Sequence, residues 1–459
     1  MKFYQSDVFG LIHKYNVPGP MYTSYPTALQ LTDSFDKGLI DKDVSERQSV
    51  PRSISLYFHI PFCFSLCWYC GCTKIITKDQ DRGDVYLDYL EKEMELRKVT
   101  LHPETDVHQI HFGGGTPTFL TPEQLRRLGK SIHSYFNIHP DAEFSVEIDP
   151  RRVGEDHILA LKEIGCNRAS LGVQDTNDDV QEAIRRIQPF EQTRFVADLL
   201  RKHDIKHINI DLIYGLPKQT LASFKKSIDD VLSLDPDRFA VYSYAHIPSI
   251  MPSQKLLNEA DLPTSEEKLN LLVFAVDYLT RAGYNYIGMD HFAKESDELS
   301  IALKEGTLHR NFQGYSTRAE LEMLGLGMSS ISQNENLYAQ NEKDLNIYYE
   351  RLDSGKLPVK KVVELSEEDK IRKKVIMQIM CRGAIDYDRF LDETGLVFKE
   401  KFSAELERLK EPEADGLLSL MNNGFKITPA GRLFLRNIAM VFDEYLTQKR
   451  HKTAYSKTV

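Results

Sequence analysis

The sequence predicts an α/β fold built on a parallel sheet, with an N-terminal arm before it and a small, mostly helical domain after it. Six short apolar runs rich in β-forming residues alternate with amphipathic helical stretches between residues 54 and 244. Such strand–helix repeats form parallel sheets with right-handed crossovers. Turn-forming residues dominate before residue 50, and after residue 365 helices precede a short hairpin. We therefore divide the chain into residues 1–50, 51–364 and 365–459.

The arm is rich in rigid and aromatic residues. Tyr22 and Tyr25 stand close to Pro18, Pro20 and Pro26. This composition suits an ordered segment lying across a domain better than a free tail. On chemistry alone, we interpret the arm as a surface-packed extension.

The first predicted strand, Ile54–Ile60, alternates apolar and polar residues and stops at Pro61. Four of the six cysteines follow within ten positions: Cys63, Cys67, Cys70 and Cys72. Soft thiolates bind iron–sulfur clusters, zinc or copper(I). The C-x3-C-x2-C spacing of the first three is one ligand short of a closed tetrahedral zinc site, and it suits a four-iron, four-sulfur cluster with one open iron.

Two other interpretations of the cysteines stay open at this point. Cys72 as a fourth ligand would give a structural zinc site, although the single residue between Cys70 and Cys72 disfavours a compact tetrahedron. Buried structural cysteines are the second alternative, and they would need no clustering.

The remaining strand–helix units follow in order. The predicted strands are His108–Phe112, Glu143–Ile148, Arg168–Val173, His207–Ile213 and Phe239–Tyr244. The predicted helices are Val85–Arg97, Pro122–Tyr135, Glu155–Ile164, Asp178–Arg186, Glu191–His203 and Gln219–Leu232. Periodicity alone leaves open whether the sheet is flat or curled.

Polar residues and glycines recur directly after these strands. They are Gly113-Gly114-Gly115-Thr116-Pro117, Glu147 with Asp149-Pro150-Arg151, Gln174-Asp175 with Arg186 further on, Asp211, and Tyr244-Ala245-His246. Each feature alone is weak evidence for a functional site. A glycine run can simply form a tight turn, and Glu147 can simply be a solvated carboxylate in a loop. Since the carboxyl ends of parallel strands share one edge, together they predict a site there.

Three features follow the six units. A seventh extended run, Tyr284–Met289, leads into Asp290-His291, which is an acid/base pair or, as chemistry alone favours, a capped strand end. Glu368–Cys381, Phe402–Leu409 and Pro429–Tyr445 read as helices, and Gly416–Met421 with Phe425–Ile427 as a hairpin. This order indicates a winged-helix-like domain, which we expect to cover the main domain because fold alone does not fix function.

Composition limits the function classes. No run of 18 apolar residues occurs and the N-terminus lacks a signal peptide, so we expect a cytoplasmic protein without a membrane partner. Only Cys166 and Cys381 lie outside the cluster, which excludes a disulfide framework. The formal net charge of −10 argues against nucleic acid as the main partner.

These residues carry a family resemblance. Cys63, Cys67 and Cys70 after a strand, with Tyr69, resemble the cluster loop of radical S-adenosylmethionine enzymes. The longer string Tyr57–Cys72, the arm, and the strings His309–Tyr315 and Leu324–Ser332 resemble the oxygen-independent coproporphyrinogen III oxidases. The resemblance runs from Lys14 to about Tyr445. It implies a partial barrel of six strand–helix units and the conversion of two propionates of coproporphyrinogen III to the vinyl groups of protoporphyrinogen IX in haem biosynthesis.

The resemblance also implies cofactors and site residues. Cys63, Cys67 and Cys70 would hold a 4Fe-4S cluster, and two molecules of S-adenosylmethionine would bind. The first would contact Tyr57, Gly114, Glu147 and Ile331, and the second would be lined by Tyr69, Gly115, Thr116, Gln174, Arg186, Asp211 and Ala245. Cys72 would be a functional thiol beside the substrate, and Tyr57 is a second candidate for a catalytic role.

The resemblance also implies partners, and one position of this chain differs from the family's pattern. We expect a flavodoxin- or ferredoxin-like protein as reductant and a monomeric enzyme. Met21 stands where the family's pattern has an arginine. If that arginine contacts a substrate carboxylate, another cation must do so here, and Arg310 and Arg151 are the candidates.

Three related functions are weighed against this one. A haem-binding chaperone-like relative shares the three cysteines, but Gly71-Cys72 and the Tyr22–Ala28 arm point away from it. The arm and the His309–Tyr315 string also favour the oxidase over a haem-degrading radical methyltransferase. The acidic balance disfavours a radical enzyme that modifies nucleic acid.

Overall fold

A curled sheet organises the molecule. The computed structural model describes residues 5–312, 314–318, 321–447 and 455–458. Within them, the main sheet has twelve strands in the order β16-β15-β14-β13-β1-β4-β5-β6-β7-β8-β10-β9. Six successive strands pair in parallel: β1 (Ser53–Ile60), β4 (Asp106–Gly114), β5 (Asn137–Ile148), β6 (Arg168–Gln174), β7 (His207–Tyr214) and β8 (Arg238–Ser243). The predicted parallel sheet is therefore confirmed.

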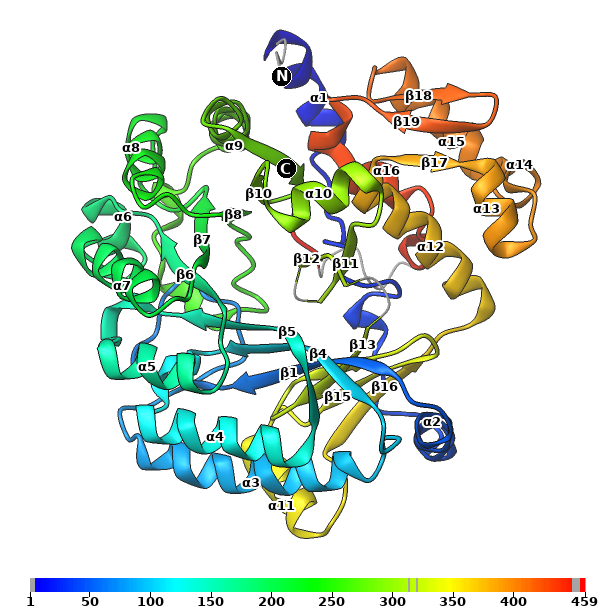
Figure 1. Cartoon of the computed structure of the whole chain (residues 1–459). Coiled ribbons are helices and arrows are strands. Elements are labelled where there is room, and N and C mark those ends of the chain that lie inside the picture. The colour runs from blue at the N-terminus through cyan, green and yellow to red at the C-terminus, as the bar shows by residue number, and fades with distance from the viewer. Residues whose placement is uncertain (1–4, 313, 319–320, 448–454, 459) are drawn as a thin grey trace.

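The sheet is curled into a partial barrel. His111 of β4 and Tyr242 of β8 line the same cavity, although three strands separate these two in the sheet. Helices cover the outside (Figure 1): α3 (Asp81–Lys98), α4 (Pro122–Tyr135), α5 (Glu155–Glu163), α6 (Asp178–Ala183), α7 (Phe190–Lys202) and α8 (Leu221–Leu232). Periodicity alone left open whether the sheet is flat or curled, and the structure shows that it is curled.

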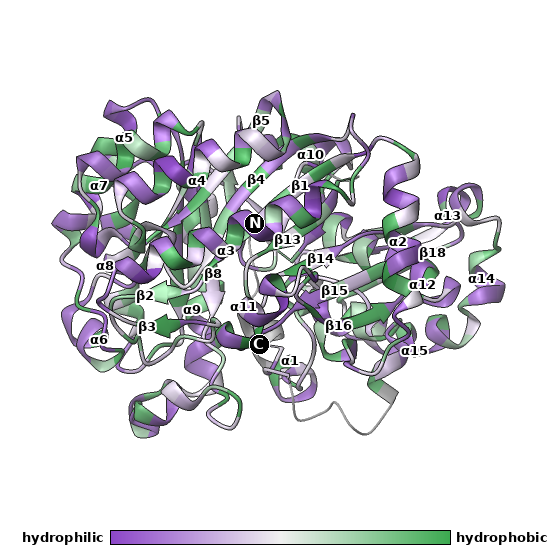
Figure 2. Ribbon diagram, turned by 90° about the horizontal axis from the view of Figure 1, so that it is seen from below, coloured by the Kyte–Doolittle hydropathy of each residue, from purple (hydrophilic) through white to green (hydrophobic). Residues whose placement is uncertain are grey.

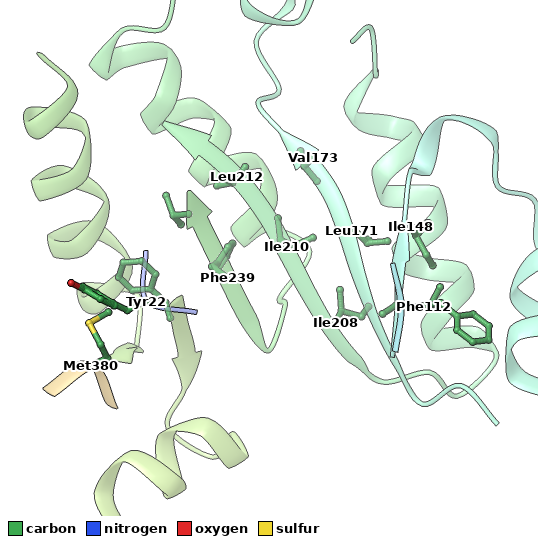
Figure 3. Packing of buried hydrophobic residues seen from close by; sticks show 14 of the residues in the cluster. Tyr22, Phe112, Ile148, Leu171, Val173, Ile208, Ile210, Leu212, Phe239 and Met380 are labelled. Atoms are coloured by element: carbon green, nitrogen blue, oxygen red, sulfur yellow. The ribbon is translucent and has the colours of Figure 1, made fainter. Parts of the chain in front are cut away.

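Strand alternation separates two environments. On β7, Ile208, Ile210 and Leu212 are buried in the hydrophobic core, whereas Asn209 and Asp211 line the lumen. Figure 3 shows labelled core side chains of β4 to β8, and Figure 2 shows hydrophobic residues concentrated along the strands. Burial of each large apolar side chain contributes about 1.5–3 kcal/mol. The outward face therefore stabilises a barrel whose inner face is polar.

Local signals explain most helix boundaries. Thr121 and Thr220 form capping boxes with Gln124 and Ser223, which fix the starts of α4 and α8. The predicted helix Asp178–Arg186 is too long, because α6 ends at Ala183 and Arg185 has a φ of +55°. The left-handed backbone there turns Arg186 inward.

Both edges of the barrel are extended. β13 (Glu322–Leu326) pairs in parallel with β1, and β14 (Ile331–Gln333), β15 (Leu337–Asn341) and β16 (Val359–Glu364) continue antiparallel. At the other edge lie β10 (His291–Lys294) and β9 (Tyr284–Gly288), which confirms the seventh extended run. The hairpin of β11 (His309–Asn311) and β12 (Gly314–Ser316) closes the lumen, with α9 (Ser265–Arg281), α10 (Glu298–Glu305) and α11 (Leu345–Asp353) outside. Gln313 of the predicted string lies outside the described residues.

The arm is more than a surface extension. It contains two helices that the sequence analysis missed, α1 (Gln5–Tyr15) and α2 (Gly38–Ser49). Tyr22 is buried and its hydroxyl donates to Asp443 Oδ2 at 2.9 Å. Tyr338 donates to the carbonyl of buried Tyr25 at 2.8 Å. The arm therefore ties the sheet extension to the C-terminal region, where Figure 1 shows α1 beside α16 (Leu435–Met440).

The C-terminal region contains α12 (Glu367–Arg382), α13 (Tyr387–Thr394), α14 (Phe398–Lys401) and α15 (Ser403–Ala414). The predicted hairpin is confirmed as β18 (Leu418–Met421) and β19 (Gly424–Ile427), with β17 (Ala384–Asp386) as a third strand. The predicted continuous helix Pro429–Tyr445 is wrong. It is broken into 3-10 turns around α16, because Asp443 accepts from Tyr22 and from the Tyr445 amide. The domain boundaries at residues 50 and 364 stay predictions.

Candidate functional site

The cysteine loop leaves the carboxyl end of β1, as predicted. Short strands β2 (Phe62–Cys63) and β3 (Ile75–Ile76) pair and hold both ends of the loop. Its four cysteines, Cys63, Cys67, Cys70 and Cys72, are free thiols that line one cavity of about 270 Å³. The loop therefore presents its sulfur atoms to a space shared with the ends of β4 to β7.

Basic and hydroxyl groups surround the thiols. Thr116 Oγ1 lies 3.3 Å from Cys63 Sγ. Arg151 Nη2 and Arg186 Nη1 each donate to Cys67 Sγ at 3.6 Å. Burial opposes ionisation of Asp149, but the Arg186 and Arg151 guanidinium groups hold its pKa below the ordinary value. Both arginines therefore contact the Cys67 sulfur, and Arg151, which also pairs with Asp149, is occupied here rather than free for a propionate.

Cys72 differs from the other three. A hydrogen bond with Cys72 lowers the pKa of Cys70 to about 6, and the same bond raises the pKa of Cys72. Burial raises the pKa of Cys63 to about 11. Cys72 therefore acts as a thiol donor toward Cys70, which suits a neighbouring thiol better than a further ligand.

The glycine turn packs directly on the cysteine loop. Gly114 has a φ of +114°, a conformation that side chains other than glycine rarely adopt. A Cβ on Gly115 would lie 2.5 Å from the carbonyl oxygen of Pro61. Only glycine fits at these positions, so the run brings backbone groups to the cavity rim.

Polar side chains of the strands face the same space. His111 Nδ1 lies 2.6 Å from Ser145 Oγ, and His111 Nε2 lies 3.3 Å from Glu147 Oε1. The Tyr57 ring stacks on His111, with 5.9 Å between centroids. The Glu147 side chain remains 46% exposed. Its carboxylate can therefore accept hydrogen bonds from an amine or hydroxyl group of a ligand.

Asp211 lies deeper in the lumen. Ser170 Oγ donates to one carboxyl oxygen at 2.8 Å, and Asn209 Nδ2 donates to the other at 2.7 Å. Burial, reinforced by the charge of Glu147, raises the pKa of Asp211 to about 7. A cationic ligand nearby would draw this carboxyl into its ionised form.

A second cavity of about 130 Å³ adjoins the first, and both are lined by Glu147, Ser170, Asp211 and Tyr242. His291 lines the second cavity, and burial together with Arg310 and Arg238 lowers its pKa to about 3. The imidazole is therefore neutral at physiological pH.

Buried cations gather around Asp290. Burial raises the pKa of this carboxyl to about 6, although Arg310, Arg436 and Lys268 oppose the rise. Arg310 is 3% exposed, and its Nε and Nη1 have no hydrogen-bond partner among the described residues. Asp290 is 5% exposed, and its Oδ2 has no hydrogen-bond partner among the described residues. The region holds more positive than negative charge.

The predicted site residues come together, with three exceptions. All except Tyr57, Ala245 and Ile331 line the larger cavity, so the residues assigned to the first and second cofactor share it. Tyr57 lies beside that cavity, since a Cβ on Gly113 would touch both its ring and Glu147. Gln254 Nε2 donates to the carbonyls of Ala245 and Tyr69, and Ile331 lies against Gly325, the partner of Tyr57 across β1 and β13.

Several lumen residues were missed. They are His111, Ser145, Ser170, Asn209 and Tyr242. Each lies on the polar face of a predicted strand, so the period-two alternation was the available signal.

The donor set suits an iron–sulfur cluster. Three thiols face one cavity beside two arginines, and soft sulfur ligands of this kind hold such clusters. In the described part of the chain, no group of three or more His, Cys, Asp or Glu side chains is arranged to hold a single metal ion. The cavity, with a volume of about 270 Å³, has room for a body larger than one ion.

Similarity to known proteins decides the family. A protein from Helicobacter pylori named oxygen-independent coproporphyrinogen III oxidase is 43% identical over 98% of this chain and 99% of its own length. Another of that name from Pseudomonas aeruginosa is 44% identical over 95% of both chains. This chain belongs to the oxygen-independent coproporphyrinogen III oxidases. The predicted family is therefore confirmed.

The family's fold is also confirmed. A solved structure of coproporphyrinogen III oxidase from Escherichia coli, described as a radical SAM enzyme, superposes with a TM-score of 0.89 at 42% identity, covering 93% of this chain and 97% of that one. Residues 57–231 match the radical SAM superfamily, and residues 365–434 match the HemN C-terminal domain. Membership in this superfamily implies a 4Fe-4S cluster and S-adenosylmethionine. None of the described helices is long and apolar enough to cross a membrane.

Proposed function

We propose that the protein converts coproporphyrinogen III to protoporphyrinogen IX by oxidative decarboxylation of two propionates, in the cytoplasm and as a monomer, within haem biosynthesis. The carrying observation is that Cys63, Cys67 and Cys70 line one cavity in a chain whose full-length relatives bear this oxidase name. When bound, the cluster and S-adenosylmethionine supply a 5′-deoxyadenosyl radical that removes a β-hydrogen from a propionate. Loss of carbon dioxide, with transfer of one electron to an external one-electron acceptor, would then leave a vinyl group.

The chain's own residues bind and orient the reactants. Cys63, Cys67 and Cys70 would hold the cluster, with Arg151 and Arg186 donating hydrogen bonds to the Cys67 sulfur. The backbone at Gly114 and Gly115 allows the close approach of a ligand at the cavity rim.

Carboxylates would bind the cofactor, and buried cations would bind the substrate. Glu147 and Asp211 would accept hydrogen bonds from the amine and ribose groups of the cofactor. Arg310, Arg436 and Lys268 would attract the anionic substrate, because their excess positive charge is buried around a single carboxyl group.

We further propose that two cofactor molecules are used per product, one for each propionate. The shared cavity supports this proposal: Gly114 and Glu147 from the first implied set and Tyr69, Gln174, Arg186 and Asp211 from the second lie around one space. Cys72 and Tyr57 are the candidates for hydrogen or proton transfer. A flavodoxin- or ferredoxin-like protein would supply electrons to the cluster.

The test is a product assay. The protein is reconstituted with iron and sulfide under anaerobic conditions and incubated with coproporphyrinogen III, S-adenosylmethionine and dithionite. We expect a product that has lost two carboxyl groups, formed only with S-adenosylmethionine. An intact cluster that cleaves S-adenosylmethionine but leaves the porphyrinogen unchanged would contradict the proposal, and haem binding and haem turnover would then be measured.

A further inference from the structure

A second hollow lies beside the cysteine loop and is lined by arginines. It has a volume of about 490 Å³, and its wall includes Phe64, Ser65, Thr116, Arg151, Arg152 and Arg185. We call it the arginine groove. It shares Ser65, Thr116, Asp149 and Arg151 with the cavity that the cluster-binding cysteines line. The two spaces therefore lie on either side of one layer of side chains.

The positive charge of the groove is not neutralised internally. Arg151 pairs with Asp149 at 2.6 Å, and Arg186 behind it pairs with the same carboxylate at 3.2 Å. Arg152 and Arg185 are exposed, and neither guanidinium group has a hydrogen-bond or ion-pair partner among the described residues. The Arg152 guanidinium lies over the Phe64 ring at 4.9 Å. Because the whole chain carries a formal net charge of −10, this is a local reversal of sign.

The groove also reaches the thiols. Phe64 and Ser65 belong to the segment between Cys63 and Cys67. Thr116 Oγ1 lies 3.3 Å from Cys63 Sγ, and Arg151 Nη2 lies 3.6 Å from Cys67 Sγ. Electron transfer between protein-bound centres slows steeply with distance. A redox group held in the groove would therefore lie against residues that contact the cluster ligands directly.

We propose that the arginine groove is the docking site of an acidic electron-carrier protein that reduces the cluster. This inference rests on the proposed function. The step is a one-electron transfer in which the carrier is oxidised and the cluster is reduced, with no bond made or broken. Charge complementarity selects the occupant, since Arg152 and Arg185 on the rim attract an acidic surface. Ile187, which lines the groove and is 53% exposed, and Phe64 offer apolar contact between these charges.

Small, charged interfaces are typical of electron-transfer encounters, which bury little area and depend on steering. Electrostatic steering raises association rates by about 10- to 1,000-fold and weakens as salt is added. We therefore expect reduction by the carrier, and not by a small chemical reductant, to depend on the two exposed arginines.

The test compares two double variants of the full chain, each reconstituted with its cluster. Arg152→Glu with Arg185→Glu reverses the groove, and Arg281→Glu with Arg389→Glu makes the same change in net charge at exposed arginines on α9 and α13. Formation of 5′-deoxyadenosine is measured with reduced flavodoxin at low and high salt, and separately with dithionite. Binding of flavodoxin to each protein is measured by calorimetry.

We expect the groove variant to lose at least 10-fold in kcat/KM for flavodoxin, to bind it more weakly, and to show a smaller salt dependence. Its iron content and its rate with dithionite should match those of the control variant. The milder pair Arg152→Gln with Arg185→Gln should lie between the groove variant and the unmodified chain. Equal binding and equal flavodoxin-driven rates in the groove and control variants would overturn the proposal. Failure of dithionite to drive cleavage would instead count against the proposed function, and the calorimetry would still decide the docking site.

Discussion

The protonation of Asp211 leads to a prediction about stability. Its carboxyl group lies inside the barrel, where burial raises its pKa from 3.8 to about 7. One pKa unit corresponds to about 1.4 kcal/mol, so the difference amounts to about 4 kcal/mol at most. The ligand-free protein is destabilised by this amount when the carboxyl group is ionised.

The direction of the pH dependence follows from the protonation of Asp211 in the folded and unfolded states. Below pH 3.8 the group is protonated in both the folded and the unfolded chain, and folding is unaffected. As pH rises toward 7, the Asp211 carboxyl group ionises only in the unfolded chain. Ionisation stabilises the unfolded state, so the free energy of unfolding falls steadily. Above the folded-state pKa the loss is complete and constant.

Asp211→Asn removes this titration with little change of shape. Ser170 Oγ can turn and accept a hydrogen bond from the new amide, while Asn209 still donates to the remaining oxygen. We expect the variant to gain about 2–3 kcal/mol of stability relative to the unmodified chain as pH rises from 5 to 7, because one titrating group contributes at most about 1.4 kcal/mol per pH unit, and then to approach a constant difference above pH 7.

The assay is urea unfolding of the ligand-free proteins under anaerobic conditions between pH 5 and 8, followed by circular dichroism. Other titrating groups cancel in the difference between the two chains. Asp198→Asn on the exposed face of α7 is the control, because its side chain lies in water. A difference between Asp211→Asn and the unmodified chain that does not change with pH would refute the reasoning.

Three further predictions follow from single contacts. Cys72→Ser should keep the iron content of the reconstituted protein but lose turnover of the porphyrinogen; full turnover with an intact cluster would remove the proposed role. Arg310→Met should raise the KM for coproporphyrinogen III by about 10- to 150-fold, because a hydrogen bond to a charged group contributes about 1.5–3 kcal/mol, whereas an unchanged KM would place the substrate elsewhere. Glu93→Gln should lower the free energy of unfolding by about 3–5 kcal/mol, since it leaves buried Arg97 unpaired, and urea unfolding that shows under 1 kcal/mol would contradict this.

Much of the barrel could be predicted because each strand has a recognisable pattern in its own local sequence. Alternation and flanking turn residues placed all six parallel strands, and His207–Ile213 matches β7 to within one residue. The helix α2 was missed because this polar segment has little amphipathic pattern. The break in Pro429–Tyr445 depends on Asp443 meeting Tyr22, some 400 positions earlier in the chain. No local pattern contains such a contact.

Some residues of the candidate site could be predicted from the sequence and others could not. Glu147 and Asp211 lie within β5 and β7 near their carboxyl ends, and they could be proposed because parallel strands end at one edge. Ser170 and Asn209 could not, since their role depends on which face of the sheet curls inward. Ile331 lies against Gly325, the partner of Tyr57, because β13 and β14 extend the sheet beyond β1.

The distribution of charge connects the two proposed binding regions. Lys268, Arg310 and Arg436 face a single buried carboxyl group, Asp290. Arg436 donates to the carbonyls of Gly19 and Pro20, the residues just before Met21, so its hydrogen bonds are satisfied without loss of its positive charge. Positive charge therefore stands next to the position where the family's pattern has an arginine. Excess positive charge therefore lies both in this interior and along the arginine groove, and each of these regions can attract an anionic partner.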